Sequence, residues 1–481
     1  MNRFLIYVTT LILFSCGEKQ AEKKKAAQPP NIVLIFTDDQ GYQDVSVFGA
    51  DDIATPNLDQ MAADGVKLTS FYAAQAVCSA SRAGILTGCY PNRIGIHNAM
   101  MPNSDIGLHP SETTLAELLK DKGYTTGIFG KWHLGDHPDF LPTKHGFDEY
   151  FGIPYSNDMW PLHPQQGPIF DFGPLPLFEN ETVIDTLTDQ TNLTTQITER
   201  SIDFIKKNKD KPFFLYVPHP QPHVPLFVSD KFRGKSNRGL YGDVIMEIDW
   251  SVGQILETLK TNGLEENTLV IFTSDNGPWL AYGNHSGSAL PFREGKGTAW
   301  EGGQREPFIV KYPEKLEAGK TITTPVMAID ILPTVAEITG AELPKNIIDG
   351  KSVWKVLTGE TTESPQEAYF FYYRVNELHG VRYGKWKLYF PHRYRTMNGQ
   401  EAGKDGLPGE YRMVDLDEIE LYDVVNDVSE VNNIAAENPE VVAKIKLLAD
   451  DMRSRLGDSL LKMEGSETRQ AGAIDLIPIK K

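Results

Sequence analysis

The chain has 481 residues, of which 40% are hydrophobic and 23% charged, proportions typical of a globular protein. This length accommodates one large α/β domain and a smaller domain beside it. The formal net charge of −18 disfavours binding to a phosphate backbone, so we expect no nucleic-acid partner.

The N-terminus has the layout of an export signal. Arg3 precedes an apolar run over residues 4–14, which is too short to span a bilayer. Small and apolar residues then lead into Cys16, an order similar to a bacterial lipobox, in which the cysteine carries the lipid. We therefore expect a lipoprotein signal peptide over 1–16, a flexible tether over 17–30, and an exported protein anchored to a membrane through Cys16. The alternative is an ordinary signal peptide with an incidental cysteine.

Helices and strands alternate over residues 31–363, the expected main domain. Apolar runs predict buried strands at 31–37, 124–130, 212–217 and 268–276. Apolar residues at helical spacing predict helices that begin at Pro56 and that cover 114–122, 191–207 and 244–259. Such alternation favours an α/β fold with a large, mostly parallel sheet covered by helices on both faces.

The pattern changes over residues 364–481. Aromatic runs at 368–373, 379–390 and 419–425 are typical of strands without intervening helices, and a helix is expected over 439–456. These residues predict a small C-terminal α+β subdomain with an antiparallel sheet.

Polar side chains follow four of the predicted strands. They are Asp38 and Asp39, then Lys131 and His133, then His219 and His223, and finally Asp275 and Asn276. Because ligands of open parallel sheets bind outside the carboxyl ends of the strands, we expect these side chains to share one site.

Four of these residues offer oxygen atoms to a metal ion. They are Asp38, Asp39, Asp275 and Asn276. Carboxylates combined with an amide suit a hard cation and favour Ca²⁺ over Zn²⁺. For a single aspartate the alternative role is that of a loop cap.

Cys78 precedes a segment that can form a helix, and Arg82 follows it by four residues. The helix N-terminus and the arginine would both lower the pKa of this thiol, so the residues predict an activated nucleophile. A soft thiolate, however, is a poor partner for Ca²⁺, which indicates that the cysteine is chemically changed. Cys89 either pairs with Cys78 or is a lone buried thiol; for Cys78 itself the alternative is a buried structural cysteine.

The segment Cys78-Ser79-Ala80-Ser81-Arg82 resembles the C-x-[PA]-x-R signature of type I sulfatases, the arylsulfatase A-like family. The resemblance extends, in order, over "TDDQG", "GKWHLG", "HGFDEYFGIPYSND", "PHPQPHVP", "FTSDNG" and "REGKGTAWEGGQREP". It implies an alkaline-phosphatase-like sandwich with a catalytic domain over 31–363. It also implies that a maturase oxidises Cys78 to Cα-formylglycine (3-oxoalanine), whose hydrate supplies an oxygen nucleophile held by one calcium ion.

The resemblance also implies roles for individual residues. The calcium ligands of the family are matched by Asp38, Asp39, Asp275, Asn276 and the modified Cys78. Arg82 matches the residue that positions the formylglycine, and the contacts to sulfate are matched by Lys131, Lys296 and Ser156. His133 matches the base at the formylglycine, and His223 matches the histidine near the leaving group. His219 competes with His223 for one motif, and Arg293 is expected as a nearby structural or substrate contact.

The implied reaction is the hydrolysis of a sulfate ester. One hydroxyl of the hydrate attacks sulfur, His223 protonates the departing oxygen, and His133 takes a proton from the second hydroxyl so that sulfate leaves. A sulfated carbohydrate is the expected substrate, with the loops at 155–178 and the region 374–395 lining its sugar subsites. The alternative for both segments is plain packing. The alternatives are a phosphodiesterase or phosphonate monoester hydrolase of the same superfamily, and a catalytically silent glycan-binding lipoprotein.

Overall fold

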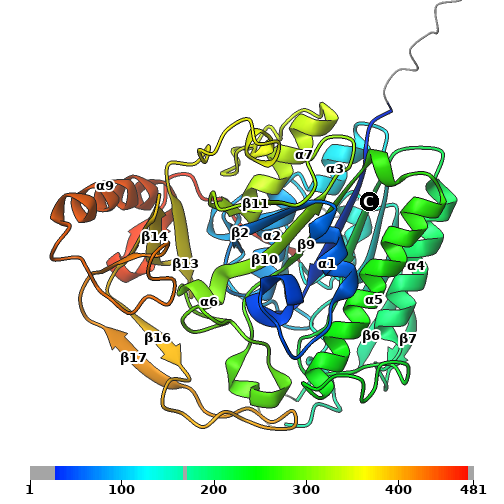
Figure 1. Cartoon of the computed structure of the whole chain (residues 1–481), viewed down its shortest axis with the longest axis horizontal. Helices are drawn as coiled ribbons and strands as arrows, with labels where there is room; N and C mark the ends of the chain where they lie inside the picture. Colours follow the sequence, from blue (N-terminus) through cyan, green and yellow to red (C-terminus); the bar gives the residue numbers. More distant parts are fainter. Residues whose placement is uncertain (1–27, 166–170, 475–481) are drawn as a thin grey trace, which may run out of the picture.

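The computed structural model describes residues 28–165 and 171–474 (Figure 1). Cys16 and the expected signal peptide lie outside the described residues. Within the described part of the chain, no helix combines the length and the apolar character needed to cross a membrane.

The centre of the molecule is an eleven-stranded mixed sheet. Its strand order is β11 (Lys320–Ile322), β2 (Val66–Tyr72), β10 (Arg305–Lys311), β9 (Thr268–Ser274), β1 (Asn31–Thr37), β8 (Phe213–Pro218), β4 (Thr125–Lys131), β5 (Glu149–Ile153), β6 (Leu175–Glu179) and β7 (Thr182–Leu187), with β12 (Val326–Met327) also on β2. The strands from β9 to β5 run parallel, whereas β10 is antiparallel to both of its neighbours and β6 and β7 form an antiparallel edge. The expected mostly parallel sheet is confirmed.

Helices cover both faces of this sheet, because the strands present apolar side chains on both sides. On β1, Ile32, Leu34 and Phe36 pack toward α2 (Cys78–Thr87), α3 (Leu115–Lys120) and α7 (Ile331–Thr339). Val33 and Ile35 pack toward α1 (Pro56–Ala63), α4 (Leu193–Asn208) and α5 (Leu240–Thr261). The helices expected at 114–122, 191–207 and 244–259 correspond to α3, α4 and α5.

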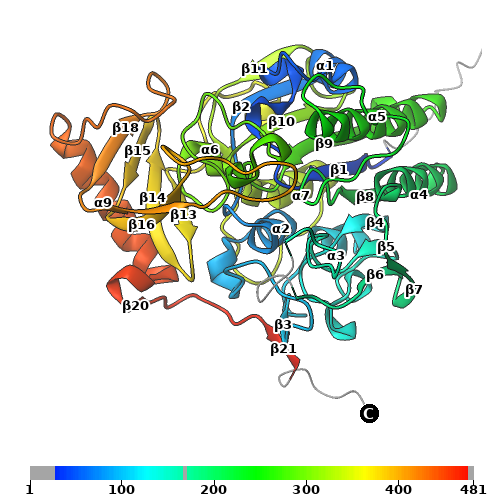
Figure 2. The ribbon, with the colours of Figure 1, turned by 90° about the horizontal axis from the view of Figure 1, so that it is seen from below.

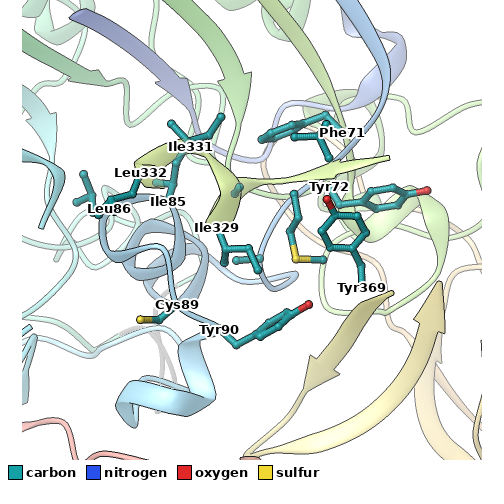
Figure 3. Packing of buried hydrophobic residues seen from close by; sticks show 14 of the residues in the cluster. Phe71, Tyr72, Ile85, Leu86, Cys89, Tyr90, Ile329, Ile331, Leu332 and Tyr369 are labelled. Atoms are coloured by element: carbon teal, nitrogen blue, oxygen red, sulfur yellow. The ribbon is translucent and has the colours of Figure 1, made fainter. Parts of the chain in front are cut away.

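The C-terminal half of α2 is anchored in the core. Figure 3 shows Ile85 and Leu86 beside Ile331 and Leu332, with Cys89 just beyond the end of the helix. Cys78 and Cys89 are both free and buried, so they form no disulfide and Cys89 is a lone buried thiol.

The C-terminal subdomain has an antiparallel sheet, as expected. Its order is β13 (Tyr369–Tyr373), β14 (Glu377–Tyr383), β15 (Trp386–Tyr389) and β18 (Glu420–Asp423), with α9 (Pro439–Leu456) packed on β14. Its smaller elements are the hairpin β16 (His392–Thr396) with β17 (Arg412–Leu416) and the pair β19 (Gly457–Asp458) with β20 (Met463–Glu464). Two short helices, α6 (Glu301–Gln304) and α8 (Trp354–Leu357), belong to the large domain. The tail then returns to the large domain, where β21 (Gly472–Ala473) pairs with β3 (Ile106–Gly107) (Figure 2).

Candidate active site

The register of two parallel strands brings the predicted oxygen ligands together. Thr37 at the end of β1 is level with Ser274 at the end of β9, so Asp38 and Asp275 leave the sheet side by side. The Asp39 amide donates to Oδ1 of Asp275 at 3.1 Å, and Nδ2 of Asn276 donates to Oδ1 of Asp39 at 2.7 Å. The structure therefore places all four residues in one buried cluster.

Three buried cations balance these carboxylates. Nη2 of Arg82, on α2, donates to Oδ2 of Asp38 at 2.9 Å and to Oδ2 of Asp275 at 3.0 Å. Nζ of Lys131, at the end of β4, lies 2.5 Å from Oδ2 of Asp38 and 3.0 Å from Oγ of Ser156. Nζ of Lys296 lies 2.8 Å from Oδ2 of Asp39.

The ion pairs determine the charge states in this cluster. Burial alone would raise the pKa of Asp38, but Lys131 and Arg82 lower it well below its usual range. Burial would lower the pKa of Lys296, but the charge of Asp39 raises it well above its usual value. Asp38 and Lys296 are therefore charged despite being buried.

Cys78 is the first residue of α2, as expected, but its thiol is not activated. Burial raises the pKa of Cys78 to about 12, against the opposing effects of Lys131 and Lys296. The predicted low pKa is therefore wrong: Arg82 is engaged with Asp38 and Asp275, and both carboxylates disfavour a thiolate. The Sγ atom lies 3.4 Å from Nζ of Lys296, inside the cluster.

The cluster has the composition of a metal site. Asp38, Asp39, Cys78 and His223 each offer one ligand atom, and these atoms all lie within 4.8 Å of one another. In addition, Oδ1 of Asp38 and Oδ1 of Asn276 are buried without a hydrogen-bond partner. Because a buried oxygen atom without a partner is costly, these two atoms fit a bound cation.

Two histidines border the cluster in different ways. Nε2 of His133 lies 2.9 Å from the Met100 carbonyl oxygen, while its buried Nδ1 has no hydrogen-bond partner. Burial, together with Lys131 and Arg82, holds the pKa of His133 well below its usual range. Nδ1 of His223 lies 2.6 Å from the Val224 carbonyl oxygen, and its Nε2 faces Oδ2 of Asp39 at 3.5 Å.

His219 and Arg293, two further candidates from the sequence, bond to other parts of the fold. Nε2 of His219 lies 3.3 Å from Oγ of Ser251 on α5, and burial lowers the pKa of this histidine to about 4. The Arg293 guanidinium stacks 3.5 Å from the centre of the Trp300 ring and donates to the Tyr394 hydroxyl at 2.9 Å. Arg293 thus links the large domain to the C-terminal subdomain. This contact corresponds to the structural role, one of the two roles expected for this residue.

The structure adds neighbours that the sequence analysis did not single out. The Trp279 ring centre lies 5.5 Å from that of His223 and 4.7 Å from Nζ of Lys296. Arg395, on β16, donates twice to the Lys296 carbonyl oxygen, at 3.0 and 2.6 Å. The position of Trp279 just after the "SDNG" motif was a usable signal, whereas Arg395 lies 99 residues from Lys296 along the chain.

Comparisons with known proteins agree with this architecture. The model of the sulfatase family matches residues 30–341, and two models described as "N-sulphoglucosamine sulphohydrolase, C-terminal" and "C-terminal region of aryl-sulfatase" match 295–401 and 364–472. Arylsulfatase A of Bos taurus is 41% identical over 385 residues, which are 76% of this chain and 75% of that protein. N-acetylgalactosamine-6-sulfatase of Mus musculus is 41% identical over 431 residues, which are 85% of this chain and 79% of that protein.

Solved structures share the fold. The structure of Ps i-CgsB in complex with k-i-k-neocarrahexaose has a TM-score of 0.74 and 30% identity, covering 88% of this chain and 93% of that one. The phosphonate monoester hydrolase of Agrobacterium radiobacter has a TM-score of 0.60 at 19% identity, covers 88% and 95% of the two chains, and shows the fold alone. The expected alkaline-phosphatase-like sandwich is therefore confirmed. From the family match over 30–341 and the identity with both named sulfatases, this chain belongs to the sulfatase family as an arylsulfatase A-like type I sulfatase, and it is a sulfuric ester hydrolase.

Proposed function

We propose that the protein hydrolyses sulfate esters on sulfated carbohydrates, and that a maturase converts Cys78 to formylglycine beforehand. The observation that carries the proposal is the position of Cys78, inside a cluster of metal-ligand type and 3.4 Å from a lysine ammonium. A thiol with a pKa of about 12 is a poor nucleophile there, whereas an oxygen atom at this position suits both a hard cation and the lysine. One relative is an N-acetylgalactosamine-6-sulfatase and another has a neocarrahexaose bound, and both support a carbohydrate substrate.

We assign Ca²⁺ binding to Asp38, Asp39, Asp275 and Asn276, with the converted Cys78 as a further ligand. When bound, the ion would stabilise negative charge on an oxygen nucleophile and on a sulfate oxygen. Arg82 holds Asp38 and Asp275 together through one nitrogen and so fixes the spacing of two ligands.

Lys131 and Lys296 supply the positive charge that binds sulfate. An ammonium group has three N–H donors, and Lys131 uses two of them on Asp38 and Ser156. Lys296 reaches both Asp39 and the Cys78 side chain. These fixed cations favour the charge that develops on sulfate oxygens during the reaction.

The two histidines have geometries that suit opposite proton transfers. The Val224 carbonyl accepts from Nδ1 of His223, so a proton on Nε2 is the one available to the departing oxygen, with Asp39 beside it to stabilise the imidazolium. The Met100 carbonyl accepts from Nε2 of His133, which leaves Nδ1 as the proton acceptor. We therefore assign the general acid to His223 and the general base to His133.

Export and lipidation at Cys16 belong to the same proposal and rest on the N-terminal sequence. Replacing Cys16 by serine should move the protein from the membrane fraction to the soluble fraction. An unchanged distribution would contradict the lipid anchor.

The test of the function uses protein produced with a maturase, assayed on matched aryl sulfate and aryl phosphate and then on a panel of sulfated oligosaccharides. We expect turnover of the aryl sulfate and of at least one oligosaccharide, dependent on Cys78 and abolished in Cys78→Ala. Faster turnover of the phosphate would favour the phosphodiesterase alternative. Oligosaccharide binding without turnover would favour the silent glycan-binding alternative.

A further inference from the structure

The catalytic base proposed above depends on a loop that has few contacts of its own. Residues 97–105 contain neither helix nor strand, and Asn98, Met101, Asn103 and Asp105 are exposed. Met100 alone turns inward, with 6% of its surface exposed. This inward residue is the one that contacts His133.

Both peptide groups next to Met100 bond to residues of the active site. The Met100 carbonyl oxygen lies 2.9 Å from Nε2 of His133, and its amide donates to Oγ of Ser79 at 2.9 Å. Ser79 follows Cys78 on α2. Because a carbonyl oxygen can only accept, it fixes the proton of a neutral His133 on Nε2 and leaves the lone pair of Nδ1 free to accept a proton.

The C-terminal tail contacts the chain at both ends of the loop. β21 pairs with β3, and the Ile474 amide donates to the Asp105 carbonyl oxygen at 3.0 Å. Gly95, at a φ of 72°, lets the tail approach closely, since a Cβ atom there would lie 2.6 Å from the Ala471 nitrogen. The tail therefore contacts the chain on both sides of the loop, at Gly95 and at Asp105, while α2 holds Met100 in its middle.

Arg469 anchors this tail to the large domain. Its Nε and Nη2 donate to the two carboxylate oxygens of Glu112 at 2.6 and 2.8 Å, and Nη1 donates to the Ile347 carbonyl at 3.0 Å. The Glu112 side chain is 3% exposed, so this forked ion pair is largely shielded from solvent. Arg93 adds a second tie, with its Nη1 donating to Oε2 of Glu467 at 3.1 Å.

We infer that residues 467–474 form a latch that fixes the 97–105 loop, so that Met100 and Arg469 are positioning residues for His133. The inference rests on the proposed role of His133 as base. A loosened latch frees the Met100 carbonyl, and His133 then no longer presents Nδ1 in one tautomer and orientation. The latch acts on the proton-transfer step and leaves the sulfate contacts of Lys131 and Lys296 in place.

The test compares Arg469→Ala with Arg238→Ala as a matched control. Arg238 forms a half-exposed ion pair with Asp52 at 3.0 Å, on a different part of the molecule. We expect Arg469→Ala to speed amide hydrogen exchange over residues 97–107 by about tenfold or more, as for a segment that opens locally. We expect it to lower kcat for an aryl sulfate about tenfold with KM nearly unchanged. Arg469→Lys should restore part of both, and Arg238→Ala should change neither.

A double variant shows whether the effect passes through His133. In the His133→Ala background, Arg469→Ala should cause no further loss of kcat, because the base is already absent. An equal loss in both backgrounds, or unchanged exchange over 97–107, would overturn the latch. If Arg469→Ala does not fold, Glu112→Gln weakens the same fork and takes its place. Hydrogen exchange tests the latch even if the protein turns over no sulfate ester, an outcome that would refute only the proposed function.

Discussion

At the scale of single residues, the proposed chemistry depends on hydrogen bonds that orient two histidines in opposite senses. His223 has its Nδ1 on a backbone carbonyl and its Nε2 toward Asp39, while His133 has its Nε2 on a backbone carbonyl and its Nδ1 without a partner. A protonated Nε2 on His223 suits a general acid, and the contribution of such an acid depends on the leaving group.

His223→Ala should therefore affect substrates unequally. On a sulfated sugar, whose alkoxide is a poor leaving group, kcat should fall by a factor of about 10²–10⁴. On an activated aryl sulfate, whose phenolate leaves unprotonated, the loss should stay below about tenfold. Steady-state kinetics on both substrates measure the two losses, and His219→Ala, which removes a histidine bonded to Ser251, is the control. Equal losses on both substrates in His223→Ala would show that His223 is not the general acid.

Most of the buried carboxylate cluster could be predicted from the sequence. Its oxygen ligands directly follow apolar runs that form strands: Asp38, Asp39, Asp275 and Asn276. The pKa of Cys78 could not be predicted, since it depends on burial and on which carboxylates engage Arg82. The contacts of the Arg293 side chain could not be predicted either, because its partners Trp300 and Tyr394 come together only in the folded chain.

At the scale of elements, the positions of Cys78 and Arg82 depend on how α2 packs against the core. Leu86 is fully buried near Leu332 of α7 (Figure 3). Leu86→Ala should lower the free energy of unfolding by about 2–5 kcal/mol, through lost burial and the cavity left behind. The exposed Val183, on the edge strand β7, is a control whose change to Ala should stay within about 0.5 kcal/mol. Urea unfolding measures both, and equal effects would contradict a packed support for α2.

Three strands could not be predicted because their sequences do not form a continuous apolar run. Five of the six residues of β7 are exposed, so no apolar pattern marks this strand. β10 carries Arg305 and Glu306 in buried positions, and β16 carries Arg393 and Arg395, so neither strand begins as an apolar run. The parallel core strands β1, β8 and β9 are fully buried and could be predicted from their continuous apolar runs.

At the scale of the whole molecule, several buried histidines make stability depend on pH. Burial lowers the pKa of His145 to about 3, and the stacked rings of His379 and His392, whose centres lie 3.9 Å apart, also have pKa values lowered to about 3 by burial. A pKa that is lower in the folded state means that protons favour the unfolded state. The stability from these groups is complete above a pH of about 6.5 and is lost as the pH falls toward 3.

We therefore expect His392→Gln to lose less stability than the wild-type protein on acidification. Between pH 7 and pH 5 each such histidine should lower the free energy of unfolding by about 2 kcal/mol. The variant lacks one of these histidines, so its free energy of unfolding should fall by about 2 kcal/mol less than that of the wild-type protein. Urea unfolding at the two pH values measures this difference. Val183→Ala, at an exposed position on the edge strand β7, is the control, and its loss should match the wild-type loss. Identical acid losses in all three proteins would contradict a buried neutral His392.

The division of the chain into two parts could be predicted only in outline. Aromatic runs and the helix at 439–456 marked the C-terminal subdomain, and α9 lies at those residues. The return of the tail could not be predicted, because β21 and β3 are two residues long and pair across more than 360 positions. Strands this short leave no periodic pattern in a sequence.

The proposed chemistry depends on the chemical state of residue 78 in the active protein. The direct measurement is mass spectrometry of the tryptic peptide that contains Cys78, taken from protein whose turnover of a sulfate ester has been measured in the same preparation. We predict a peptide that has lost one sulfur and two hydrogen atoms and gained one oxygen, in a fraction that rises with specific activity across preparations. Full activity in a preparation whose Cys78 peptide is entirely an unmodified thiol would contradict the account.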